Sequence, residues 1–219
     1  MKYAITKEQR FFFDTHLFIE FEELLSKSDR ELLLRGVEKE FGAPIDTIAQ
    51  EEIFLRGRDI AMRQSGLRKA LFTPGLGQIA QELTGQKRLR FGFDQLYSTL
   101  LTKPDLTIFS QLEEESCIRG LACAIMICLK GEAQEENKAD QGIDPFPSKP
   151  GSGIFFLPSV VCNPHALQAH PNQLFLLLAW AKSKAQYVFA PRDPHTHDLK
   201  KLGFVFGDSL TEKYHPTWK

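Results

Sequence analysis

The sequence predicts an α+β fold in which N-terminal helices pack against a β-rich second half. Helical spacing of apolar residues dominates up to about residue 86, and short apolar runs of strand length follow from about residue 87. The two kinds of segment do not alternate, which argues against a parallel β-α-β sheet. We therefore expect one domain over 1–219, with a helical buttress at about 1–86 and a β-rich core at about 87–219.

Four helices are expected in the first half. Thr6 and Gln9 form a capping box that opens the first helix. A second capping box at Ser28 and Glu31 precedes apolar residues at helical spacing, and Gly42 ends that helix. The other elements expected in this half are a short strand at 17–21 and helices at about 45–56 and 74–83.

The second half is expected to supply most of the strands, at 88–97, 118–129, 154–157, 174–180, 186–190 and 202–206. The first of these alternates polar and apolar residues, which predicts a strand with one buried face. The run 118–129 is almost wholly apolar, and we assign it to a buried strand although its length also allows a helix. Residues 130–153 are polar and rich in Gly and Pro, which indicates a long surface loop.

Composition excludes several classes of protein. The formal net charge of −1 gives no basic excess, so nucleic-acid binding is not expected. The longest apolar runs, 121–129 and 174–181, fall short of the roughly 18 residues that span a bilayer, and the start does not resemble a signal peptide. We expect a cytoplasmic protein with no membrane partner. The four cysteines form no C-x-x-C motif and are expected to be buried free thiols.

Five segments, in their order along the chain, carry a resemblance to a known family. They are Phe11–Leu25, Arg58–Gly85, Phe91–Tyr97 (FGFDQLY), Gly151–Ser159 (GSGIFFLPS) and Ala190–Asp193 (APRD). Together they resemble the phytanoyl-CoA-hydroxylase-like branch of the iron(II)/2-oxoglutarate-dependent oxygenases. The resemblance spans most of the chain and implies a double-stranded β-helix, a jelly-roll-like barrel with the N-terminal helices packed on it.

The same resemblance fails at the iron ligands, which in that family are two histidines and one carboxylate. The first two ligands come as His-x-Asp or His-x-Glu, and none of the six histidines here begins such a motif. By resemblance, Ser110 and Leu112 stand at those positions, and Gln186 or Tyr187 stands where the distal histidine would lie. Lys200 and Lys201 stand where a basic residue would pair with the oxoglutarate carboxylate. The chain thus resembles a degenerate member of the family, for which we expect neither iron nor oxoglutarate as a cofactor.

The segment Asp193–Asp198 (DPHTHD) is the other candidate site. If it is extended, His195 and His197 point to the same side and could share a cation. The sequence names no third ligand, and Asp193-Pro194 is also typical of a turn. We expect solvated loop histidines, with a metal site at His195 and His197 as the alternative.

The favoured hypothesis is a non-catalytic or divergent protein on this fold that binds a small molecule or a protein partner. One alternative is a divergent metal-dependent oxygenase with His195 and His197 as relocated ligands. A second alternative, a metal-responsive DNA-binding repressor, is disfavoured because no basic recognition helix and no paired cysteine motif is found.

Overall fold

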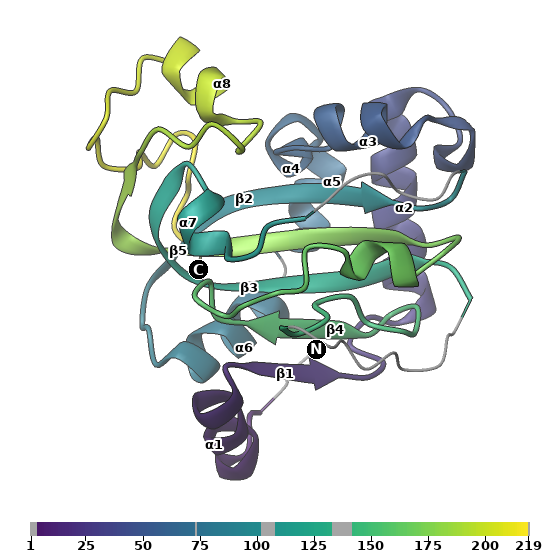
Figure 1. Cartoon of the computed structure of the whole chain (residues 1–219), viewed down its shortest axis with the longest axis horizontal. Coiled ribbons are helices and arrows are strands. Elements are labelled where there is room, and N and C mark those ends of the chain that lie inside the picture. The colour runs from purple at the N-terminus through teal and green to yellow at the C-terminus, as the bar shows by residue number, and fades with distance from the viewer. Residues whose placement is uncertain (1–3, 73, 102–107, 133–141, 219) are drawn as a thin grey trace.

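A computed structural model describes residues 4–72, 74–101, 108–132 and 142–218 of the chain (Figure 1). Its strands form an antiparallel sheet in the order β1-β4-β3-β5-β2. The strands are β1 (Phe18–Phe21), β2 (Leu89–Ser98), β3 (Ile118–Lys130), β4 (Gly153–Phe156) and β5 (Leu174–Tyr187).

The two faces of this sheet are covered differently. Helices of the first half cover one face and bury a core that includes Val37, Ile53 and Trp180. These helices are α1 (Lys7–His16), α2 (Lys27–Phe41), α3 (Gln50–Arg56), α4 (Ile60–Arg63), α5 (Ser65–Leu71) and α6 (Pro74–Thr84). Connecting segments and two short helices, α7 (Leu112–Glu115) and α8 (Thr196–Lys201), enclose a second core on the other face. The predicted α+β class is confirmed.

In the first half of the chain, the local sequence signals predicted most of the helices and their ends. The Thr6 side chain accepts a hydrogen bond from the Gln9 amide at 3.1 Å, so the first capping box is confirmed. The second was wrong, because Ser26 rather than Ser28 caps α2 by accepting from the Asp29 amide. The helix expected at 45–56 is divided into a 3₁₀ turn at Ile45–Thr47 and α3.

The second half needs three corrections. β2 is buried along almost its whole length, so the prediction of one solvated face was wrong: helices cover one side of it and connecting segments the other. β5 is one continuous strand where two were expected at 174–180 and 186–190. Residues 202–206 are not a strand; they follow α8, a helix that was not predicted.

Other expectations from the second half were met. The apolar run 118–129 is a strand, β3, and all four cysteines are buried free thiols. Of the expected loop at 130–153, residues 142–152 contain no helix or ladder strand, and residues 133–141 lie outside the described part. None of the described helices combines the length and the apolar character that crossing a membrane requires.

Candidate functional site

A cavity of about 430 Å³ opens on the sheet face that the connecting segments cover. That volume lies within the roughly 300–1,000 Å³ typical of small-molecule sites. Apolar side chains make up part of its wall: Phe54, Phe93, Ile108, Phe109, Leu112 and Pro194. The polar and tyrosine side chains are Arg58, Gln95, Tyr97, Glu115, Ser116, Arg192 and Asp193.

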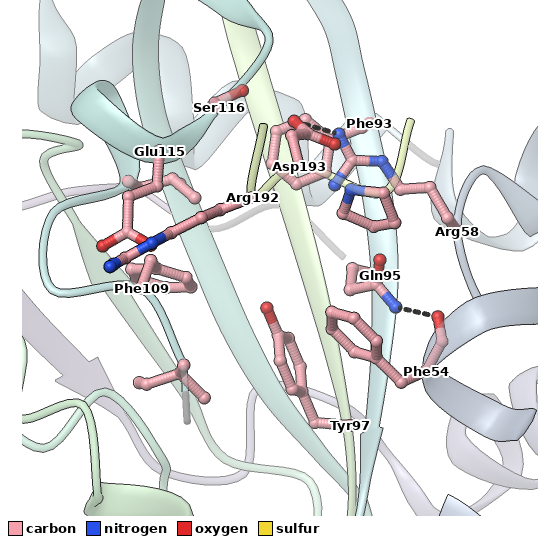
Figure 2. A pocket seen from close by; sticks show the side chains of 13 residues that line it. Phe54, Arg58, Phe93, Gln95, Tyr97, Phe109, Glu115, Ser116, Arg192 and Asp193 are labelled. Atoms are coloured by element: carbon pink, nitrogen blue, oxygen red, sulfur yellow. Dashed lines mark hydrogen bonds and ion pairs between the residues drawn. The ribbon is translucent and has the colours of Figure 1, made fainter. Parts of the chain in front are cut away.

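Strand β2 supplies the floor of the cavity. Alternate residues of a strand point to the same face, so Phe93, Gln95 and Tyr97 all face the cavity, as Figure 2 shows. A bulge after Phe91 places that residue in the core on the helix side instead. Gln95 is fixed by its amide nitrogen, which donates to the Phe54 carbonyl at 2.8 Å.

A buried ion pair closes one end of the cavity. Arg58 follows α3, and its segment lies along β2 because the Leu96 amide donates to the Gly57 carbonyl at 3.0 Å. Its guanidinium lies 3.5 Å from the Phe93 ring centre and donates from Nη2 to Asp193 Oδ2 at 3.0 Å. Both side chains are less than a tenth exposed. Because a charge removed from water is stabilised only by close partners, this pair requires its present geometry.

Asp193 also accepts hydrogen bonds from two backbone amides. Oδ2 also accepts from the Cys117 amide at 2.8 Å, and Oδ1 accepts from the His195 amide at 2.9 Å. Burial lowers the pKa of Arg58, but the carboxylates of Asp193 and Asp59 outweigh it and raise that pKa. Arg58 therefore stays charged, and the Asp193 carboxylate has little capacity left for another cation.

A second charged cluster lies behind the pair. His195 Nε2 is 2.8 Å from Asp59 Oδ2, and the Asp94 carboxylate accepts from the Ile60 and Ala61 amides at 2.9 and 3.0 Å. Burial raises the pKa of Asp59, but the hydrogen bond and charge of His195, together with the charge of Arg58, outweigh it and lower that pKa. Burial, together with the charge of Asp59, raises the pKa of Asp94 to about 8. This cluster holds the start of α4 and thereby the position of Arg58.

The opposite wall carries a second arginine–carboxylate pair. Glu115, at the end of α7, accepts from the Ser110 amide and hydroxyl at 2.8 and 3.0 Å. Its other oxygen lies 3.4 Å from Arg192 Nη1, and the Arg192 side chain is 79% exposed. Arg192 therefore lies at the outer side of the cavity, where it can change position without disturbing the core.

Of the four positions that the family resemblance assigned to former ligands, two lie at the cavity and two lie away from it. Leu112 lines the cavity, and Ser110 holds Glu115, which also lines it. Tyr187 does not reach the cavity; its hydroxyl donates to the Thr196 carbonyl at 2.8 Å. Lys200 is exposed on α8. The assignment of these residues to former ligand positions stays a prediction.

The two histidines of DPHTHD are not brought together. The segment is not extended but turns into α8, with His195 as the residue before the helix. His195 faces Asp59, whereas His197 is exposed and lies near the Phe189 ring. Within the described ranges, no group of three His, Cys, Asp or Glu side chains could hold a metal ion.

Of the residues that line the cavity, the sequence analysis singled out Leu112 and Asp193 as candidate site positions, but it assigned no site role to Arg58, Gln95 or Tyr97. The alternation in β2 could have suggested that Phe93, Gln95 and Tyr97 share a face, although it was interpreted as solvent exposure. Arg58 had no local signal, because its role depends on Asp193, which is 135 residues away.

Comparison with known proteins gives the class of fold. No family model matches the chain, and no curated protein matches it. Among solved structures, the non-heme alpha-ketoglutarate-dependent carbocyclase SnoK from nogalamycin biosynthesis superimposes with a TM-score of 0.67, at 15% identity, over 98% of this chain and 97% of that one. The related epimerase SnoN gives 0.64 at 11% identity, over 97% of this chain and 98% of that one.

A third structure is CytC3 with Fe(II) and alpha-ketoglutarate, at a TM-score of 0.59 and 9% identity, over 85% of this chain and 81% of that one. At these identities the likeness shows the fold alone. The chain thus has the α+β fold of the non-heme iron/2-oxoglutarate-dependent enzymes, as the sequence resemblance implied.

The side chains around the cavity do not fit an iron ion. Among the residues that the structure describes, no histidine lines it, and both carboxylates in its wall are held by arginines and by backbone or serine donors. Iron(II) in this fold takes two histidines and a carboxylate with free lone pairs on one face. The cavity therefore lacks the histidine ligands of an oxygenase centre among its described residues, and its carboxylates are already paired.

Proposed function

We propose that this chain binds a small molecule in the cavity and performs no iron-dependent oxygenation. The observation that carries the proposal is that Asp193 pairs with Arg58 and Glu115 pairs with Arg192. Both carboxylates that line the cavity among the described residues are already paired. What is left is a cavity of ligand size with apolar walls and a few polar groups.

The family resemblance supports the same proposal. We infer a degenerate member of the oxygenase superfamily on the phytanoyl-CoA-hydroxylase-like branch, with Ser110 and Leu112 at the first two ligand positions. A serine hydroxyl is a weak ligand for iron(II), and a leucine side chain is none. The positions of Leu112 in the cavity wall and of Ser110 beside it agree with this inference.

The first experiment is an anaerobic calorimetric titration of the purified chain with iron(II) in the presence of 2-oxoglutarate. We expect no stoichiometric binding, and no oxoglutarate-dependent oxygen consumption when air is admitted. Tight binding of one iron per chain would contradict the proposal. If a His195→Ala/His197→Ala double variant then lost that iron, a divergent oxygenase with relocated ligands would be favoured instead.

Ligand binding is tested separately by filling the cavity. Phe109 lines it and is almost fully buried, so Phe109→Trp adds volume to the wall. Phe206→Trp makes the same change at a position that is 66% exposed and serves as the control. A fragment library is screened by chemical-shift changes in the full-length chain. We expect hits that Phe109→Trp abolishes and Phe206→Trp retains; an unchanged hit list would refute the cavity as the binding site.

A further inference from the structure

Two polar groups at the cavity have hydrogen-bonding capacity that the described residues do not use. Arg58 donates from Nη2 to Asp193, but Nη1 makes no hydrogen bond to a described residue. The Tyr97 hydroxyl likewise has no partner in that part of the chain, although Tyr97 is only 5% exposed. In Figure 2 the Tyr97 ring extends from β2 with its hydroxyl toward the interior of the cavity. Both groups are hydrogen-bond donors.

A third group offers an acceptor. The Gln95 amide nitrogen donates to the Phe54 and Leu96 carbonyls at 2.8 and 3.1 Å, which fixes which end of the amide is oxygen. The Gln95 oxygen is buried and has no partner among the described residues. A buried acceptor without a donor is destabilising, so a ligand that brings a donor gains a favourable contact there in addition to its other contacts.

The charges around the cavity sum to zero. Arg58 pairs with Asp193, and Arg192 pairs with Glu115. An anionic ligand would compete with two carboxylates, and a cationic ligand would compete with two guanidinium groups. Because moving an uncompensated charge out of water is costly, the site favours an uncharged ligand.

Aromatic side chains define the shape of the ligand. The Phe54 and Tyr97 rings lie 5.7 Å apart, centre to centre, and Phe109 stands on another side of the cavity in Figure 2. Ring faces and edges of this kind pack well against a flat aromatic group.

From these features we propose that the ligand is an uncharged aromatic molecule that carries a carboxamide, a proposal that rests on the proposed function. The ring packs among Phe54, Tyr97 and Phe109. The amide oxygen accepts from Arg58 and Tyr97, and the amide N–H donates to the Gln95 oxygen. Arg58 Nη1, the Tyr97 hydroxyl and the Gln95 oxygen then each have a partner of the correct kind.

Three probes of equal size and different charge test this proposal: benzamide, benzoate and benzamidine. The full-length chain, labelled with nitrogen-15, is titrated with each one. We expect benzamide to give saturable chemical-shift changes at the cavity. We expect benzoate to bind at least about tenfold more weakly, because it adds a negative charge and lacks the N–H donor. Benzamidine presents only donors to Arg58 and is expected not to bind.

A pair of tyrosine variants tests the contact itself. Tyr97→Phe removes the hydroxyl from the cavity and should weaken the binding of benzamide by about 3- to 10-fold, the usual effect of losing one hydrogen bond. Tyr214→Phe removes a hydroxyl from a half-buried tyrosine that packs on Phe204, away from the cavity, and should leave benzamide binding unchanged. Equal effects of the two changes would overturn the assignment of Tyr97.

The outcomes separate this inference from the function on which it rests. Tighter binding of benzoate or benzamidine than of benzamide overturns the uncharged-amide proposal and leaves a small-molecule site in place. If none of the three shifts a cavity resonance, the amide proposal is also overturned. The proposed function itself fails only if no member of the wider fragment library binds in the cavity.

Discussion

Replacement of Asp193 by alanine should destabilise the protein strongly, because it leaves the Arg58 charge buried without its closest partner. The guanidinium and the carboxylate are 3.0 Å apart, and their side chains are 7% and 3% exposed. Breaking a buried pair from one side costs about 3–5 kcal/mol. Asp193 also accepts from the Cys117 and His195 amides, so the upper part of this range is expected.

The free energy of unfolding of each variant is measured by urea denaturation, from the midpoint and the slope of the unfolding transition. A matched control is Asp198→Ala, because that carboxylate also pairs with a basic residue, Lys201, but its side chain is 55% exposed. An exposed pair contributes about 0.2–1 kcal/mol, so the control should change the midpoint little.

A double variant distinguishes the ion pair from a general effect of substitution. In Arg58→Met/Asp193→Ala both charges are removed, and the methionine can still cover the Phe93 ring. The loss of stability should be at least about 1 kcal/mol smaller than the sum of the two single losses. Additive losses, or a loss below about 1 kcal/mol for Asp193→Ala alone, would refute the view that a buried ion pair organises this site.

Three further predictions concern other parts of the fold. The folded protein holds the Asp94 proton up to about pH 8, whereas the unfolded chain releases it near its ordinary value of 3.8. Asp94 therefore makes the free energy of unfolding fall as the pH rises between these values, and urea titrations at pH 5 and pH 8 should show a smaller fall for Asp94→Asn than for the wild type. A Cβ atom at Gly77 would collide with the Trp218 indole. Gly77→Ala should therefore lower the free energy of unfolding by about 1–3 kcal/mol and change the tryptophan fluorescence. An unaltered fluorescence spectrum would contradict this prediction. Burial raises the pKa of all four cysteine thiols, and these should react with a thiol reagent only after denaturation; rapid labelling of the native protein would disprove their burial.

The elements that the sequence predicted well are those with a strong local signal. The capping box at Thr6, the apolar run of β3 and the periodic positions of α6 all specify their structure within a few residues. The helix α8 was missed because its six residues contain only two buried positions, Thr196 and Leu199. So short a helix is stabilised by its tertiary contacts and not by its own sequence.

At the candidate site, prediction from the sequence failed for a different reason. Polar residues at alternate positions of β2 suggested a face in contact with water. Asp94 instead points to the helix side and accepts from α4, and Gln95 lines the cavity. A polar residue in a strand has the same sequence pattern whether its partner is water or a distant backbone group, so only the folded contacts could distinguish the two.

The strand order has a consequence for how the chain reaches this structure. The first two strands to be synthesised, β1 and β2, occupy the two opposite edges of the sheet and do not pair with each other. Phe18 pairs with Phe156, and Leu96 pairs with Leu176. While the ribosome is still producing the first hundred residues, neither strand has a partner, and the central strands that join them come last. Such a high contact order predicts slow folding, with exposed strand edges that favour association with chaperones before β5 is complete.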